Sequence, residues 1–176
     1  MTVTKITTKT ASRTLHKTPA AHEAPPATGD AKDAIALLKA DHQEVSHLFA
    51  EYEKTHSAST KKALVAEICT ALSVHAQIEE EIFYPAVKAA LKDKLLVPEA
   101  TVEHEGVKDL IAQLEGAEPG GEMYDARVKV LSEYVKHHVK EEQTEMFPQA
   151  RASSLDMVEL GARMVARKDD LLAQAA

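Results

Sequence analysis

The sequence predicts an all-α protein, an up-down antiparallel four-helix bundle with an additional C-terminal helix and a disordered N-terminal tail. Its 176 residues are rich in Ala, Leu, Glu and Lys, which favour helix, and they include no Trp. Apolar residues recur three and four positions apart over long stretches, which is typical of helices packed in a bundle. Segments rich in Pro, Gly, Ser or Thr separate these stretches. We expect the tail over residues 1–30, the bundle over 31–150 and the further helix over 151–176.

The N-terminal tail has the composition of a segment that does not fold by itself. Residues 1–30 are rich in Thr, Ala, Pro and Lys and contain no acidic residue before Glu23. Such a composition cannot bury enough apolar surface to order the chain. An organelle transit peptide is the alternative, but the segment is poorly amphipathic, and it holds no hydrophobic stretch of the signal-peptide type. We therefore predict a soluble, cytoplasmic protein.

The first two helices follow from their apolar stripes. The first helix should run from near Asp30 to near Lys54, and a Ser/Thr-rich turn over residues 55–60 should precede the second. Pro85 should end or kink the second helix, although the helical pattern resumes through Leu91. The first stripe consists of Ile35, Leu38, His42, Val45, Phe49 and Tyr52. The second consists of Leu64, Ile68, Leu72, His75, Glu79 and Ile82.

Three further helices are expected. Pro98 and its neighbours open the third, and the glycine-rich segment from Gly116 ends it. The fifth should run from about Ser154 to Leu172, capped by Ser153 or Ser154. The stripes of the third and fourth consist of His104, Val107, Ile111 and Leu114, and of Val128, Leu131, Tyr134 or Val135, His138 and Glu142. The fifth has an apolar face of Leu155, Val158, Ala162 and Val165, and a solvated face of Glu159, Arg163, Arg167, Lys168, Asp169 and Asp170.

One helical unit occurs twice in the chain. A His is followed four residues later by Glu, and then by an aromatic residue and Pro, at His75 to Tyr84-Pro85 and again at His138 to Phe147-Pro148. Each copy follows an acidic residue and His, which are Asp41-His42 and Glu103-His104. The two His of a copy are 33 residues apart in the first and 34 in the second. Core packing alone does not explain such a repeat of potential metal ligands.

The repeated polar residues predict a metal site inside the bundle. They occupy stripe positions where a bundle normally has Leu or Ile, and a buried carboxylate or imidazole needs a partner. His and Glu without thiolate suit iron, manganese or zinc. The set exceeds the needs of one tetrahedral zinc and fits two ions that share carboxylates. The expected ligands are His42, His75, Glu79, His104, His138 and Glu142.

This pattern resembles the hemerythrin family, the HHE cation-binding domain, over roughly residues 32 to 150. The resemblance implies a non-haem di-iron centre in an up-down four-helix bundle. It implies that Glu79 and Glu142 bridge the two iron ions, together with an oxo or hydroxo group. The four His would then be terminal ligands.

The sequence departs from the family's oxygen carriers at one position. Those proteins use a fifth His four residues after the His of the third helix, where this chain has Lys108. Water or Tyr134 is a candidate to complete the site, and a core Tyr with a hydrogen-bonded hydroxyl is the alternative for Tyr134. His137 competes with His138 as the ligand, but the repeat and the position of the Pro favour His138.

Three nearby side chains have weaker assignments. Glu80 and Glu81 belong to an exposed acidic face or orient a ligand His from outside. Cys69 is expected to be a small buried hydrophobe.

Three functional hypotheses follow. The first is a di-iron protein that binds or senses oxygen, nitric oxide or peroxide. The second is a redox enzyme, such as a peroxidase, an oxidase or a nitric-oxide-consuming catalyst, that uses the same centre. The third is a bundle that holds zinc or no metal and serves as an interaction module. A net charge of −7 argues against nucleic acid, and no apolar run is long enough for a membrane span. We expect the C-terminal helix either to cover the bundle or to form a homodimer.

Overall fold

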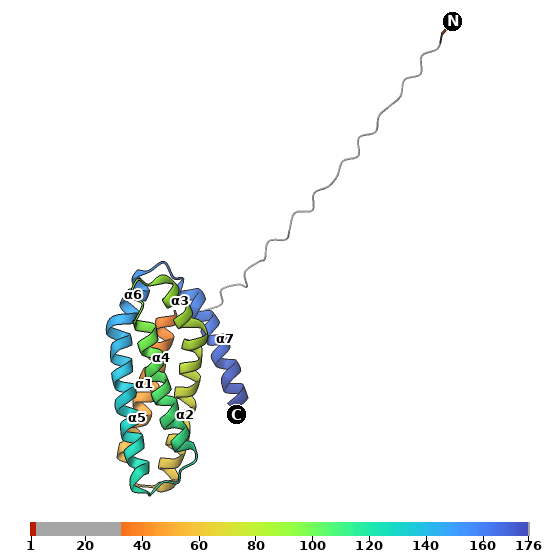
Figure 1. Ribbon diagram of the computed structural model, residues 1–176. Helices are drawn as coiled ribbons and strands as arrows, with labels where there is room; N and C mark the ends of the chain where they lie inside the picture. The colour runs from red at the N-terminus through yellow and green to blue at the C-terminus, as the bar shows by residue number, and fades with distance from the viewer. Residues whose placement is uncertain (3–32, 176) are drawn as a thin grey trace.

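The computed structural model describes residues 1–2 and 33–175, and in the second range helices alternate with short loops, with no strand among the described residues. The predicted fold is confirmed, because four long helical segments run alternately up and down and a further helix packs on their outside (Figure 1). The disorder predicted for residues 1–30 concerns a stretch that lies, except for Met1 and Thr2, outside the described residues. The elements in order are α1 (Ala34–Lys54), α2 (Ala58–Ile78), η1 (Glu79–Phe83), α3 (Tyr84–Ala90), α4 (Leu96–Glu115), α5 (Glu122–Glu141), η2 (Glu142–Met146), α6 (Phe147–Ala152) and α7 (Met157–Ala175).

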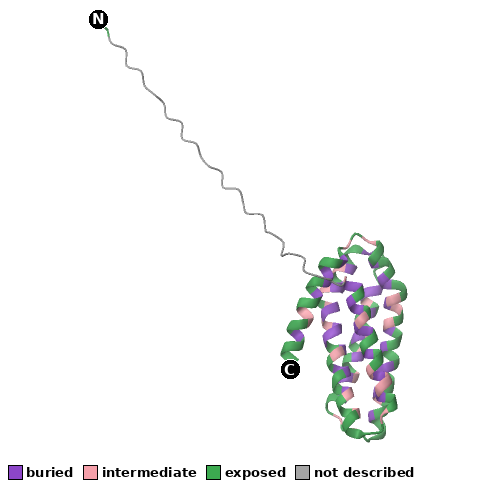
Figure 2. Ribbon diagram, turned by 180° about the vertical axis from the view of Figure 1, so that it is seen from behind, coloured by how far each residue is buried: buried purple, intermediate pink, exposed green. Residues whose placement is uncertain are grey.

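The apolar core consists of two clusters. Buried residues occur along the whole length of the bundle (Figure 2). One contains Leu38, Ile78 and Phe83 together with apolar residues of α7. The other contains Val45, Leu72 and further residues of the four long helices. The expected metal ligands are buried polar residues of the same helical segments, so a polar layer interrupts the core. We infer that apolar packing above and below fixes the helices that carry this layer.

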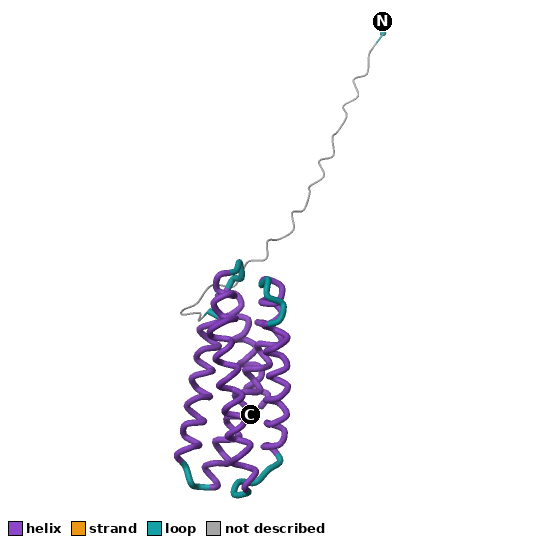
Figure 3. The backbone as a smooth tube through the Cα atoms, turned by 60° about the vertical axis from the view of Figure 1, so that its left-hand side comes forward, coloured by secondary structure: helices purple, strands orange, loops and turns teal. Residues whose placement is uncertain are grey.

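Short loops join the helices at the two ends of the bundle (Figure 3). The side chain of Asp33 caps α1 by accepting a hydrogen bond of 2.9 Å from the backbone N–H of Ala36. Gly120, in the segment between α4 and α5, has a φ of 105°. This conformation is unfavourable for a residue with a Cβ atom, so the glycine suits the turn.

Two π-helical turns carry the chain past its internal prolines. The N–H of Tyr84 bonds to the carbonyl of Glu79, and the N–H of Phe147 to that of Glu142, each five residues back. A Pro in a regular helix would clash with the carbonyl four residues earlier. After each wide turn a new helix begins, with its Pro near the N-terminus where no N–H is needed. The helical pattern therefore resumes after Pro85, and each π turn begins at one of the expected carboxylate ligands.

The C-terminal helix differs from its prediction in start, cap and face. It begins at Met157, and Asp156 caps it by accepting from the N–H groups of Val158 and Glu159 at 3.0 and 2.9 Å. Ser153 is not the cap, because its hydroxyl donates to the carbonyl of Ala150 instead. The buried residues of α7 are Met157, Leu160, Gly161, Met164 and Leu171.

The predicted apolar face of α7 was wrong because two stripes of similar spacing overlap in this helix. Val158 and Val165 are exposed, whereas Leu160 and Met164 pack against α1, α2 and η1. Two of the charged residues assigned to the solvated face also form ion pairs with other helical segments. Arg167 pairs with Glu81, and Lys168 pairs with Asp41.

No described helix is both long enough and apolar enough to cross a membrane.

Candidate metal centre

The six expected ligands meet in the middle of the bundle. Each long helical segment supplies at least one of them, and all six side chains are buried. Glu79 is 0% and Glu142 2% exposed, which makes them two of the most buried side chains of the protein. His42 comes from α1, His75 from α2, Glu79 from η1, His104 from α4, His138 from α5 and Glu142 from η2.

The histidines form two pairs, one in each half of the repeat. The Nε2 atoms of His42 and His75 lie 3.1 Å apart, and those of His104 and His138 are also 3.1 Å apart. Two nitrogens that bind one ion at about 2.1 Å lie roughly 3.0 Å apart at a right angle and roughly 3.4 Å apart in a tetrahedron. Each pair is therefore spaced closely enough for both nitrogens to bind one metal ion.

The carboxylates connect the two pairs. Glu79 Oε2 lies 3.3 Å from His75 Nε2 and 3.4 Å from His104 Nε2. Glu142 Oε2 lies 3.4 Å from His42 Nε2 and 3.6 Å from His138 Nε2. Each carboxylate thus reaches one imidazole of its own half and one of the other half. This arrangement fits carboxylates that bridge two ions.

Every ligand imidazole has a partner on its other nitrogen. His75 Nδ1 lies 3.4 Å from Asp41, and His138 Nδ1 lies 2.8 Å from Glu103. The Nδ1 of His104 lies 2.9 Å from Glu80, and that of His42 lies 3.1 Å from the amide of Gln143. Such partners fix the orientation of the ring and direct Nε2 toward a metal. Glu80 therefore takes the orienting role that was one of its two predicted alternatives.

The site has the electrostatics of anions that require a cation. Burial alone would raise the pKa of Glu79, but His75 and His104 outweigh it and hold that pKa well below its usual range. Burial would lower the pKa of His75, but Glu79 and Asp41 raise it to about 10. In the same way the pKa of His138 is raised, because Glu103 and Glu142 outweigh burial. Glu79 thus stays ionised by drawing positive charge onto His75, the charge that a metal ion would supply.

The donor atoms pass two tests for metal binding. Among the described residues, Glu79 Oε1 and Glu142 Oε2 are buried without a hydrogen-bond partner, which is costly for a carboxylate. Two groups of side chains each offer ligand atoms within 4.8 Å of one another. The first group is His42, His75, Glu79 and Glu142, and the second is Glu79, His104 and His138.

Sequence reasoning missed one side chain at this site. The hydroxyl of Tyr84 lies 3.0 Å from Glu142 Oε1, 3.3 Å from Glu79 Oε2 and 3.2 Å from His104 Nε2. Burial and the two carboxylates raise the pKa of Tyr84 well above its usual value, so the hydroxyl keeps its proton and donates it in a hydrogen bond. The repeat could have revealed this residue, because the equivalent aromatic in the second half, Phe147, has no hydroxyl. Phe147 instead stacks on His42 with ring centroids 5.9 Å apart.

The structure does not support Tyr134 as a metal ligand. Its side chain is 52% exposed and contacts Gly106 on the surface, whereas Val135 takes the buried position of the stripe. Lys108, which replaces the fifth His, pairs with Glu80 at 2.6 Å and so supports the partner of His104.

Two neighbouring alternatives are also resolved. His138 joins the cluster, whereas the side chain of His137 is 63% exposed. Cys69 is buried as expected, and burial raises its pKa to about 11, which keeps it a neutral thiol.

A small apolar cavity adjoins the four histidines. Its volume is about 20 Å³, enough for a very small molecule. Its remaining walls are almost entirely apolar and include Val45, Leu72, Val107, Val135 and Val139.

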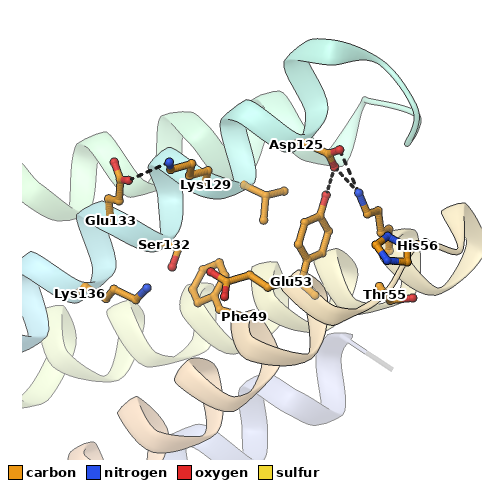
Figure 4. A pocket seen from close by; sticks show the side chains of 12 residues that line it. Phe49, Glu53, Thr55, His56, Asp125, Lys129, Ser132, Glu133 and Lys136 are labelled. Carbon is orange, nitrogen blue, oxygen red and sulfur yellow. Dashed lines mark hydrogen bonds and ion pairs between the residues drawn. The ribbon is translucent and has the colours of Figure 1, made fainter.

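A second, larger cavity of about 520 Å³ lies between α1 and α5, near the loop that joins α1 to α2 (Figure 4). Asp125 there accepts hydrogen bonds from Tyr52 and Lys61. None of the expected ligands lines this cavity.

Comparisons with known proteins agree with the fold and the cluster. The family described as Hemerythrin HHE cation binding domain matches residues 33–150. A crystal structure of a hemerythrin HHE cation binding domain-containing protein from Mycobacterium kansasii, a homologue of Rv2633c, superimposes with a TM-score of 0.71. It is 25% identical in sequence, and the alignment covers 82% of this chain and 90% of that one.

Two curated proteins are also similar. The uncharacterized protein Rv2633c of Mycobacterium tuberculosis is 26% identical over 143 residues, which are 79% of this chain and 87% of that protein. A DNA nickase of Nostoc sp. is 27% identical over 115 residues, which cover 65% of this chain but only 32% of the nickase. The match to the family extends over the whole bundle and includes all six clustered side chains. The chain therefore belongs to the hemerythrin family of HHE cation-binding domains.

Proposed function

We propose that this protein binds two iron ions in the buried cluster and uses them to bind or sense a small oxidant: oxygen, nitric oxide or peroxide. One observation carries the proposal. Two imidazole pairs, joined by two carboxylates that each reach both pairs, adjoin an apolar cavity of about 20 Å³. Six nitrogen and oxygen donors without thiolate are more than one tetrahedral zinc site needs, which favours iron.

Each of the six residues would have a specific role in holding the ions. His42 and His75 would hold one ion, His104 and His138 the other, and Glu79 and Glu142 would bridge them. When bound, the iron pair supplies two electrons' worth of redox capacity, which no side chain of the cluster provides.

The cavity and Tyr84 would govern what reaches the pair. The apolar walls admit small uncharged molecules and offer bulk water few hydrogen bonds. Tyr84 keeps a proton within hydrogen-bond distance of both bridging carboxylates. It can therefore stabilise negative charge that develops at the centre.

Metal content and the visible spectrum test this proposal directly. Full-length protein produced with iron should contain about two iron ions per chain and absorb in the near ultraviolet and visible range. The absorption should change when oxygen, nitric oxide or peroxide is added. Iron-loaded protein without absorption bands that is inert to all three molecules would contradict the proposal, as would a preference for one zinc ion.

A redox enzyme with the same centre is the second candidate. The buried hydroxyl of Tyr84 favours it, because reduction of peroxide or oxygen consumes protons and this hydroxyl holds one at the carboxylates. Steady-state turnover of peroxide that disappears in Glu79→Ala would favour an enzyme. Consumption of one equivalent without turnover would favour a sensor or binder.

We also propose self-association through α7. Val158, Val165 and Leu172 lie seven residues apart and are 54%, 39% and 40% exposed, so they form one apolar stripe on the outer face of the helix. Sedimentation equilibrium of the wild type and of Val165→Glu tests this, with a dimer expected only for the wild type. A cytoplasmic location and the absence of a nucleic-acid partner stay predictions, which rest on the composition and the net charge of −7.

A further inference from the structure

A further group of potential metal ligands lies at the surface, around His137, the neighbour of the expected ligand His138. His137 Nε2 lies 3.2 Å from Glu141 Oε1 and 3.3 Å from Glu103 Oε1. These three ligand atoms lie within 4.8 Å of one another. A His and Glu four apart on an exposed helix usually form only a surface pair. Here a second carboxylate from another helix, α4, converges on the same imidazole.

Glu103 connects this surface group to the buried centre. Its Oε1 faces His137, while its Oε2 accepts a hydrogen bond of 2.8 Å from His138 Nδ1. The two oxygens of one carboxylate therefore serve a surface imidazole and a buried ligand imidazole. An ion bound outside would lie one carboxylate and one imidazole away from the buried site.

Two hollows meet at these residues. An open surface hollow of about 470 Å³ is lined by His137, Glu103 and Glu141. An inner cavity of about 50 Å³ shares Glu103 and Glu141 with it and is also lined by His138 and Glu142. The buried Oε2 of Glu142 has no hydrogen-bond partner among the described residues. The surface group thus lies between solvent and the Oε2 atom of Glu142, which has no hydrogen-bond partner in the described part of the chain.

The first half of the repeat, which lies within the described residues, lacks the acidic residues that line this inner cavity. The inner cavity of the second half is lined by Glu99, Glu141 and Glu145, in addition to Glu103. The repeat aligns these three positions with Leu37, Ile78 and Ile82, which pack in the apolar cluster that α7 completes. Val74 takes the place of His137 and is buried in the same cluster. The acidic lining is therefore not a by-product of the helical repeat.

We propose that Glu103, His137 and Glu141 form a surface binding site for a divalent first-row metal ion, which receives iron(II) before it enters the buried centre. One imidazole and two carboxylates suit such an ion. The acidic inner cavity beyond them attracts cations and offers oxygen ligands on the way to Glu142. The loading role rests on the proposed function, whereas the surface site itself does not.

Zinc binding to the iron-loaded, full-length protein tests the surface site. Equilibrium dialysis should show one more zinc ion per chain in the wild type than in His137→Ala, with the same iron content in both. His47→Ala is the matched control, because His47 is also an exposed His four residues before a Glu, on α1. It should bind as much zinc as the wild type. Equal zinc binding by the wild type and His137→Ala would overturn the proposal.

Iron uptake tests the loading role. Full-length protein freed of metal by a chelator is mixed with iron(II), and the growth of the visible bands is followed in time. His137→Ala and Glu141→Gln should take up iron about tenfold more slowly than the wild type, yet reach the same final content. Uptake at the wild-type rate in both variants would overturn the loading role. Thermal melts of each variant confirm folding, which these exposed substitutions should preserve.

The two experiments separate this inference from the proposed function. Failure of the buried centre would show as a wild-type chain that takes up no iron. Failure of the surface site would show as equal zinc binding by the wild type and His137→Ala, whatever the iron content.

Discussion

The first half of the bundle, from α1 to α3, and the second half, from α4 to α6, provide the same ligands in different surroundings. Each half supplies two histidines whose Nε2 atoms lie 3.1 Å apart, and one buried carboxylate at the start of a π turn. The first half is covered by α7, whereas the second has an acidic, partly open flank. The shared parts are those that a metal centre requires, and the differing parts are those that surround it.

The two halves also differ in one hydroxyl. Tyr84 ends the first motif and contacts both carboxylates, while Phe147 ends the second and stacks on His42. A symmetric ligand set is therefore placed in an asymmetric pocket. Chemistry at the centre can be directed to one side without any change in the ligands.

The largest expected effect tests the equivalence of the two carboxylates. Glu79→Ala and Glu142→Ala should each lose iron, because each carboxylate reaches both imidazole pairs. If the free metal is about a thousandfold above its Kd, losing it costs about 4 kcal/mol of stability, or roughly 10 °C in Tm for a chain of this size. Metal analysis and thermal melts measure both effects. A variant that keeps two irons and its melting temperature would show that its carboxylate is not a bridge.

The cover over the first half should contribute the next largest effect. Met164 of α7 is 0% exposed, so Met164→Ala should lower the free energy of unfolding by about 2–5 kcal/mol. Val165→Ala is the control, because Val165 is exposed and its substitution should lower the free energy of unfolding far less. Urea denaturation of the two variants gives the difference. Equal values would mean that α7 is not packed on the first half as described.

Removing the hydroxyl that distinguishes the halves should change reactivity and leave iron content unchanged. A hydrogen bond to a charged group contributes about 1.5–3 kcal/mol, so Tyr84→Phe should slow the reaction with peroxide about tenfold or more. Stopped-flow absorption measures the rate, and metal analysis measures the iron. Tyr124→Phe serves as control, because Tyr124 is equally buried but belongs to the other apolar cluster. If both variants react like the wild type, the hydroxyl has no part in the chemistry.

Each histidine pair is supported by one lysine that contacts the carboxylate partner of one of its histidines, and removing these lysines should have smaller effects. Lys168 of α7 pairs with Asp41, the partner of His75, at 2.7 Å. Lys108 pairs with Glu80, the partner of His104. Direct partners of a ligand His affect metal affinity about 10–100-fold, so Lys168→Met and Lys108→Met, one step further away, should each cost less than tenfold. Competition with a chelator measures the affinities. A loss in only one variant would show which half depends on its lysine.

The smallest effect concerns the ion pair between Lys61 of α2 and Asp125 of α5, which links the two halves of the bundle. Hydrogen bonds from Lys61 and Tyr52 lower the pKa of Asp125, so its carboxylate stabilises the fold above the unfolded-state pKa near 4 and loses this effect as the pH falls through the lowered folded-state pKa. Asp125 is largely exposed, so Asp125→Asn should cost under about 1 kcal/mol at pH 7 and nothing once both forms are neutral. Urea denaturation at pH 7 and pH 3 checks the sign. A larger difference at pH 3 would contradict it.

Much of the fold and the ligand set could be predicted from local spacing. Stripe residues such as Leu38, Phe49 and Leu131 are buried as predicted, because the faces of a helix follow directly from its period. The paired His and Glu were recognisable because a polar residue on such a stripe needs a partner, whatever the packing around it.

Prediction failed where two registers competed or where the environment came from another helix. Tyr134 and Val135 were both compatible with the stripe, and the two faces of α7 had the same spacing. Packing against neighbouring helices decided between them, because it selects the face that buries more apolar surface.

The sequence by itself therefore determined the repeat, the helices and the six polar side chains on their buried faces, since each of these follows from spacing along the chain. The tertiary structure alone decided the contacts between helices. It placed Tyr84 against both carboxylates, gave each histidine its outer partner and set Lys168 beside Asp41. It also left the flank of His137 open while it covered the flank of Val74. Apart from that between Tyr84 and Glu79, which are five positions apart, contacts of this kind join residues from 20 to 127 positions apart, so no local pattern records them.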